Sequence, residues 1–116
     1  MRQIGLAVVL AVSLALVPLA AEAQPPDQVR RLGLLLPYVQ SDPQARARVN
    51  AFRAALQERG WTDGRNIRLE FRYSEGQPNR LPALAADLVQ QHVDVLLTAG
   101  TESTDAARKA TKTIPI

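Results

Sequence analysis

Strand-like and helix-like segments alternate along most of this 116-residue chain, and that alternation limits the folds open to it. The first strand-like segment carries a nearly continuous run of leucines, which is typical of a strand buried on both faces. A helix-like segment follows each of the first three strand-like ones, and the first two of these helices carry apolar stripes at helical spacing, at residues 45, 49, 52 and 56 and at residues 81, 84, 85 and 88. The strand-like segments are residues 30–37, 66–73, 93–99 and the opening of a fourth at 114–116. This β-α-β-α-β-α-β pattern predicts an α/β fold with a doubly wound parallel sheet.

The second strand-like segment differs from the others, because apolar and polar residues alternate strictly from Asn66 to Tyr73. A period of two leaves one face buried and one face wet, which suits the edge of a sheet that helices cover. We therefore predict the strand order 2-1-3. Ligands of such sheets bind beyond the carboxyl ends of the strands, where the order reverses. In this chain that point lies between strands one and three.

Capping and turn signals predict where the helices begin and end. Residues 41–44 (Ser-Asp-Pro-Gln) indicate a helix start with Ser or Asp as the cap, and Gly60 suits the left-handed residue that ends this helix. We expect Asn79 to cap the second helix. A loop over residues 100–104 should then lead into a third, short helix over residues 105–112.

The loops after strands one and three supply the candidate binding residues, within residues 38–42 and 100–104. The expected ligand contacts are Tyr38, Gly100, Thr101, Ser103 and Thr104. Hydroxyls and free backbone N–H groups at a helix start favour an anion, such as the carboxylate of a small metabolite. The alternative for Thr101 and Ser103 is plain capping of their own helix. Tyr38 either lays its ring over a ligand or covers the sheet edge.

Charge and residue usage argue against several classes of protein. The chain has 14 Lys and Arg against 11 Asp and Glu, and its basic residues are scattered, whereas a nucleic-acid binder shows a dense basic patch with interleaved aromatic residues. One His and no Cys argue against a zinc site or a nucleophile–base pair. The sequence lacks the G-x-S-x-G, phosphate-loop and G-x-G-x-x-G motifs. We expect no nucleic-acid partner, no cofactor, no metal and no enzymatic activity.

The first 23 residues have the features of a cleavable secretory signal peptide. Arg2 follows the start, residues 4–17 are almost unbroken apolar residues, and Ala21-Glu22-Ala23 offers the small-x-small cleavage pattern. The alternative is an uncleaved membrane anchor, but the apolar run is shorter than the roughly 20 residues of a spanning helix. We expect cleavage after Ala23, an extended leader over residues 24–29, and location in the periplasm. Gln24 follows the cut where a lipoprotein needs Cys.

Several stretches of the chain resemble one family. Residues 31–37 (RLGLLLP), 51–67 (AFRAALQERGWTDGRNI), 93–101 (VDVLLTAGT) and 111–116 (TKTIPI) are similar to ABC-transporter substrate-binding proteins of the tryptophan/tyrosine-binding type. The likeness extends, in order, over essentially the whole chain after residue 23. It implies a periplasmic binding protein with a type I-like fold, in which two α/β lobes close on a small ligand.

The resemblance also implies partners and a place for the site residues. The ligand would be an amino-acid-like small molecule, and an ABC permease in the inner membrane would receive it. Tyr38 and the Thr101–Thr104 hydroxyls would fall in the ligand cleft, while Ser74 and Glu75 would lie further out. Residues 30–116 would form an incomplete N-terminal lobe. Two alternatives stay open: a secreted small α/β enzyme, and an inactive truncated gene product.

Overall fold

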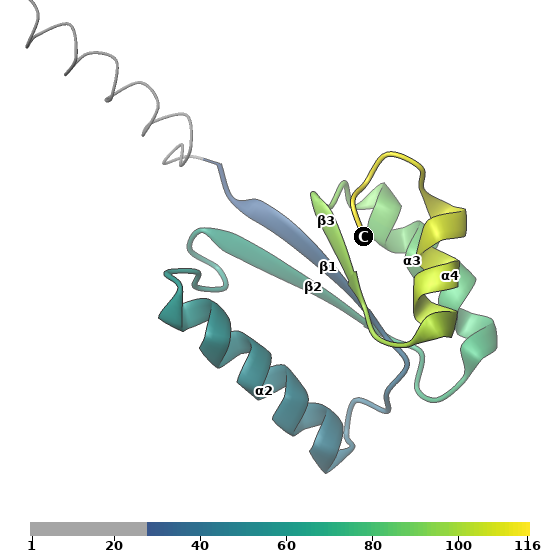
Figure 1. Cartoon of the computed structure of the whole chain (residues 1–116), viewed down its shortest axis with the longest axis horizontal. Helices are drawn as coiled ribbons and strands as arrows, with labels where there is room; N and C mark the ends of the chain where they lie inside the picture. Colours follow the sequence, from purple (N-terminus) through teal and green to yellow (C-terminus); the bar gives the residue numbers. More distant parts are fainter. Residues whose placement is uncertain (1–27) are drawn as a thin grey trace, which may run out of the picture.

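The computed structural model describes residues 28–116. The elements follow in the order β1 (Arg30–Leu36), α2 (Pro43–Glu58), β2 (Ile67–Tyr73), the 3-10 turn η1 (Pro78–Arg80), α3 (Leu81–Gln90), β3 (Val95–Thr98) and α4 (Thr101–Ala110). The three strands form one parallel sheet in the order β2-β1-β3 (Figure 1). The predicted fold class, strand order and edge position of β2 are therefore confirmed. The expected signal peptide and residues 24–27 of the expected leader lie outside the described residues.

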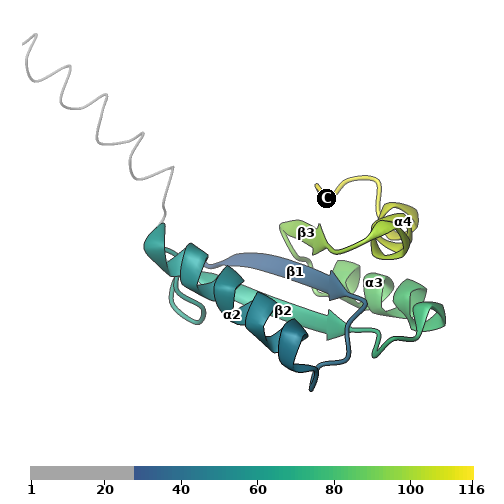
Figure 2. The same cartoon turned by 60° about the horizontal axis from the view of Figure 1, so that its bottom comes forward.

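Helices lie on both faces of the sheet, with α2 on one side and α3 and α4 on the other (Figures 1 and 2). Right-handed connections explain this arrangement, because the steps from β1 to β2 and from β2 to β3 run in opposite directions across the sheet. β1 becomes the central strand. It pairs with β2 along its full length and with β3 over residues 32–35.

The most completely buried part of the core lies on the α3–α4 side of the sheet. Leu35 of β1 and Leu96 of β3 point to this side and are 0 % and 1 % exposed. They pack against a stripe on the two helices formed by Leu81, Ala85, Leu88, Ala106 and Ala107. Gly33 faces the same core, where a Cβ atom would lie only 3.0 Å from Leu96 Cδ2. The predicted apolar stripe of the second helix is thus confirmed as a core face.

The α2 side of the sheet is covered less completely. Leu34 and Leu36 of β1 are buried there, but Ala45 is the only buried residue of α2. Val95 and Leu97, on the same face of β3, remain 42 % and 38 % exposed. The apolar stripe of α2 is only half-buried at Val49, Phe52 and Leu56. One helix therefore shields a sheet face that is wider than the helix.

Two of the predicted helix ends match the structure. The Asp42 side chain caps α2 by accepting a hydrogen bond from the Ala45 N–H at 3.0 Å. Gly60 lies just beyond α2 with φ +88°, the left-handed conformation in which glycine has no steric penalty. Sequence signals that act within one turn of the chain were sufficient for both positions.

Two other helix starts were predicted wrongly. Asn79 does not cap α3, because it lies inside η1, which leads directly into the helix. The third helix, α4, begins at Thr101 and not at Asp105, so most of the expected 100–104 loop is helical. Gly100 has φ +84°, which lets the chain turn from β3 into α4 without an intervening loop.

Two strand details also differ from expectation. Glu70 and Arg72, on the polar side of β2, are half-buried and not wet, because α3 lies over this face and Asp87 forms an ion pair with Arg72. Residues 114–116 are not assigned as a strand. Nevertheless the Pro115 carbonyl accepts a hydrogen bond from the Leu96 N–H at 2.8 Å, so the chain already runs beside β3.

Candidate functional site

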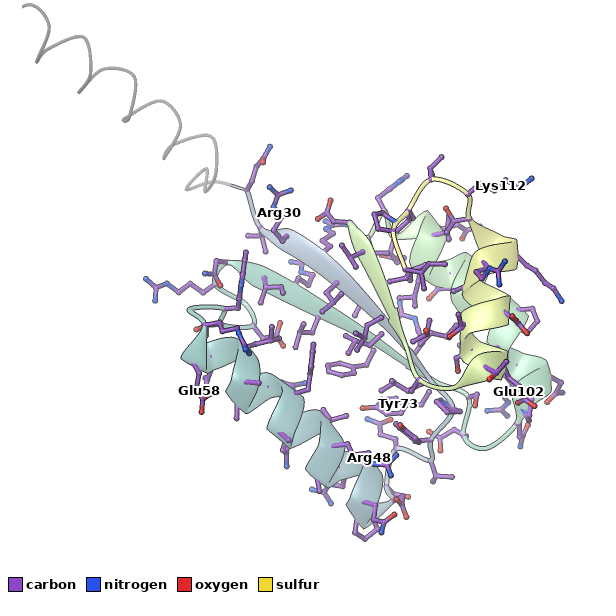
Figure 3. All side chains as sticks on the ribbon, viewed as in Figure 1. Arg30, Arg48, Glu58, Tyr73, Glu102 and Lys112 are labelled. Carbon is purple, nitrogen blue, oxygen red and sulfur yellow. The ribbon has the colours of Figure 1, made fainter. Side chains whose placement is uncertain are left out.

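The carboxyl ends of the three parallel strands meet at one edge of the sheet, where a doubly wound fold holds its ligands. Figure 3 shows Arg48, Tyr73 and Glu102 near this edge, while Arg30 and Lys112 lie toward the opposite one. The three segments that leave the strands here are residues 37–42, 74–77 and 99–104. The candidate site is built from them.

The segments after β1 and β2 are tied together by backbone hydrogen bonds. The N–H groups of Ser74, Glu75 and Gly76 donate to the carbonyls of Leu36, Tyr38 and Pro37 at 2.9, 3.1 and 3.1 Å. The Glu75 carboxylate also accepts from the Gln40 N–H, at 3.2 and 3.3 Å. Glu75 has φ +57°, an uncommon backbone conformation for a residue with a Cβ atom. Glu75 therefore lies against the Tyr38 segment, and the expectation that it lies further out is wrong.

Tyr38 is half-buried and is held by a residue of α2. Its hydroxyl accepts a hydrogen bond from Arg48 Nη1 at 3.1 Å, and Arg48 Cζ lies 5.3 Å from the ring centroid. The Tyr38 ring is therefore fixed at the rim of an apolar pocket of about 140 Å³. The other lining residues come from β1, α2 and the β3 end: Leu34, Leu36, Val49, Phe52, Leu97 and Ala99. This pocket is where the segments after β1 and β3 meet, at the predicted reversal of strand order.

The segment after β3 presents the start of α4 to the same edge. Gly100 takes the cap position, and no side chain caps the helix. The Thr104 hydroxyl instead donates back to the Gly100 carbonyl at 2.8 Å and shares a 2.7 Å hydrogen bond with the Thr98 hydroxyl. Capping by Thr101 or Ser103, the alternative weighed from the sequence, is therefore wrong. The first N–H groups of α4 and the exposed Thr101 remain open to an anion.

Ser103 occupies a different position from the other predicted contacts. Its side chain is 0 % exposed, on the core face of α4 with Ala106 and Ala107, and its Oγ has no hydrogen-bond partner among the described residues. A helix buries residues three and four apart on one face, so Ser103 follows the core stripe. Of the five predicted residues, Tyr38, Gly100 and Thr101 lie on the surface of the edge, Thr104 braces it, and Ser103 points inward.

Polar and charged side chains line a second hollow at this edge. A polar hollow of about 520 Å³ is lined by Gln40, Ser41, Arg46 and Glu75. Nearby, burial raises the pKa of the Tyr73 phenol above its ordinary value of 10.0; Arg53 opposes this rise and Glu75 adds to it.

Within residues 28–116, no three His, Cys, Asp or Glu side chains gather in a way that would suit a metal ion. In the same residues, no helix is both long and apolar enough to cross a bilayer.

Two residues that contact the Tyr38 segment, Arg48 and Glu75, were not predicted from the sequence as part of the candidate site. The position of Glu75 follows from the parallel pairing of β1 and β2, which brings residues just after the two strands together. The parallel pairing can be predicted from the sequence, but an edge position for β2 suggests that residues after it lie far from the site. No sequence signal marks Arg48, which meets Tyr38 only because α2 folds back along the sheet.

The chain is a doubly wound α/β protein, and an uncapped helix start, an aromatic rim and an apolar pocket lie at its strand ends. Proteins of this fold hold their ligands at that position. The family described as ABC transporter substrate binding protein matches residues 38–116. That match covers more than half of the chain. The chain therefore belongs to the ABC transporter substrate-binding protein family.

Two relatives place the chain more closely. A tyrosine-binding protein of Clostridioides difficile (strain R20291) is 34 % identical over 65 residues, which cover 56 % of this chain and 19 % of that protein. A substrate-binding protein with adhesive properties from Clostridium difficile, solved in a ligand-free, open form, is 28 % identical with a TM-score of 0.66. That similarity covers 75 % of this chain and 29 % of the solved one. The chain thus spans less than a third of the length of either relative.

The description of the family names a substrate and an ABC transporter, and the solved relative is likewise described as a substrate-binding protein. Substrate-binding proteins of such systems are typically extracytoplasmic, and the family is generally non-enzymatic.

Proposed function

We propose that this chain contributes one ligand-binding wall of a solute-binding protein in an ABC-type uptake system. In this proposal, residues 1–23 direct export and are cleaved after Ala23, the protein works in the periplasm, and residues 30–116 form part of its N-terminal lobe. An inner-membrane permease receives the ligand. Family membership and the α/β fold with its open strand ends support this function.

The ligand in this proposal is an amino-acid-like molecule. Its carboxylate lies at the start of α4, where uncapped backbone N–H groups and the partial positive charge of a helix N-terminus favour an anion. Its side chain lies toward the Tyr38 ring and the apolar pocket behind it. The name of the tyrosine-binding relative is consistent with an aromatic ligand. The single observation that carries the proposal is the uncapped start of α4, which follows directly after Ala99, a residue that lines the same pocket as Tyr38.

Binding without conversion separates this function from a secreted α/β enzyme. The described edge offers anchoring groups, namely N–H donors, Thr101 and Tyr38. Its three carboxyl groups serve other contacts or face solvent, and that of Asp42 caps α2. Glu75 already accepts from a backbone N–H, and Glu102 is exposed at the start of α4. We therefore expect a ligand to be recovered unchanged after saturable binding.

The test is calorimetric titration of the longest product of this reading frame with tyrosine, tryptophan and a non-aromatic amino acid. Thr101→Pro removes one N–H donor at a helix position that tolerates proline, and Thr101→Ala keeps that donor as the matched control. We expect Thr101→Pro to weaken binding about tenfold, as the loss of a hydrogen bond to a charged group does. We expect Thr101→Ala to change affinity less. Unchanged affinity in both variants, or consumption of the ligand, would contradict the proposal.

A further inference from the structure

The edge of the sheet opposite the candidate site holds the amino ends of the strands and the carboxyl ends of the helices. Its segments are residues 28–31, 58–68, 90–94 and 108–112. They carry eight basic residues and only three acidic ones, whereas the remaining described residues carry five basic and six acidic ones. The fold therefore gathers at one edge basic residues that are scattered along the sequence.

Most of the basic side chains at this edge are exposed and unpaired within the described residues. We refer to seven exposed ones as the amino-end basic surface: Arg30, Arg59, Arg65, Arg68, Arg108, Lys109 and Lys112. Figure 3 shows Arg30 and Lys112 on the opposite side of the molecule from Glu102. The ion pairs found within residues 28–116 join Arg53 and Arg72 to carboxylates and involve none of the seven. No carboxylate of the described residues therefore neutralises this surface by direct contact.

The acidic residues of the same edge serve other contacts. Asp63 pairs with Arg53 of α2 at 3.5 Å, and Asp94 accepts a hydrogen bond from the Arg31 N–H at 2.8 Å. A polar hollow of about 340 Å³ lies beside the start of β1 and gives this edge room for an anionic group; its lining residues are Gln28, Val29, Arg30, Arg31, His92 and Asp94.

Helix dipoles account for only part of the amino-end basic surface. A cation near the carboxyl end of a helix is favourable, which explains Arg108 and Lys109 in the last turn of α4. Arg30, Arg65 and Arg68 lie instead at or just before the starts of strands, and sheets have only small net dipoles. An anionic partner outside the chain explains both groups of residues.

We propose that the amino-end basic surface docks the protein on a membrane of anionic phospholipids. Basic side chains are attracted to anionic headgroups over about one Debye length, roughly 8 Å at physiological salt. A nucleic acid matches this surface less well, because no aromatic side chain of residues 28–116 is fully exposed for bases to stack on. The choice of a membrane as partner rests on the export that the proposed function includes.

The place of this surface in the chain brings it to a bilayer during export. Arg30 is the seventh residue after the expected cleavage point, and seven extended residues span at most about 25 Å. The basic edge therefore stays near the membrane until cleavage. Afterwards the same contact keeps the protein beside the bilayer that holds its permease, while the candidate site lies at the far edge and stays open to ligand.

The test is co-sedimentation of the exported chain with vesicles of phosphatidylcholine, alone or mixed with phosphatidylglycerol. We expect binding only to the mixed vesicles, and weaker binding at high salt. Arg65→Gln combined with Lys109→Gln should weaken this binding about tenfold or more, because two charges leave the surface. The matched control, Arg46→Gln combined with Arg80→Gln, removes the same charge from exposed positions nearer the other edge and should change binding less than about twofold.

All of these proteins share one N-terminus, so a difference between the two double variants reports only where the charge was removed. Arg30→Gln combined with Lys112→Gln is the second surface variant, in case circular dichroism shows that the first does not fold. Equal weakening by the surface and control variants would overturn the proposal, because net charge alone would then govern binding. Equal binding to vesicles of phosphatidylcholine alone, or tighter binding to duplex DNA than to the mixed vesicles, would overturn it too.

Ligand titration in the presence of the vesicles separates this inference from the proposed function. A protein that binds ligand but no anionic vesicle overturns membrane docking and leaves the proposed function standing. A protein that binds the mixed vesicles through this surface but binds no ligand supports docking and contradicts the proposed function.

Discussion

Individual residues at the sheet edge show which site features a sequence reveals. Tyr38 and Thr101 were predicted because they follow strands, and residues that follow parallel strands share one edge. The inward position of Ser103 was missed, because helix periodicity can be applied only once the helix start is known, and α4 begins four residues early. The Tyr38–Arg48 contact depends on tertiary packing and left no trace in the sequence.

Tyr73 gives a residue-level prediction about alkaline stability. Burial raises the pKa of its phenol, so the folded protein holds the proton more tightly than the unfolded chain does. This contribution to stability is fully present below the unfolded value of about 10 and is lost as the pH rises through the higher folded value. We expect the free energy of unfolding to fall more steeply above pH 10 in the parent protein than in Tyr73→Phe, with little difference at pH 7. Urea denaturation across this range is the measurement, and parallel curves up to pH 11 would contradict the assignment.

At the level of elements, the strands were easier to predict than the helix starts. A continuous apolar run indicates a strand buried on both faces, and strict alternation indicates an edge strand. The observed strand order β2-β1-β3 agrees with both patterns. Helix starts depend on local backbone geometry. Asp42 gave a usual side-chain cap and was predicted, whereas α3 and α4 begin without any side-chain cap and were placed wrongly. A 3-10 turn leads into α3, and a glycine with positive φ, Gly100, leads into α4. Neither feature was predicted from the sequence.

The cap of α2 gives the element-level prediction. Asp42→Ala removes the acceptor for the Ala45 N–H and should lower the free energy of unfolding by about 1 kcal/mol. Asp42→Asn keeps an acceptor oxygen and should cost only a few tenths of that, through loss of charge near the helix start. Chemical denaturation of the three proteins under one buffer condition measures both. Equal losses for Ala and Asn would show that the side-chain charge, and not the hydrogen bond, stabilises this helix start.

Over the whole molecule, the two faces of the sheet are unequally protected from solvent. Two adjacent leucines of β3 allow the faces to be compared, because Leu96 is buried on the α3–α4 side and Leu97 is partly exposed on the α2 side. Leu96→Ala should lower the free energy of unfolding by roughly 2–5 kcal/mol, because it leaves a cavity in the closed α3–α4 core. Leu97→Ala should cost only about 1 kcal/mol, since much of that side chain already meets solvent. Urea denaturation of residues 28–116 measures the difference, and a failure of Leu96→Ala alone to fold agrees with it. Similar costs at both positions would mean that the α2 side is already closed in this chain.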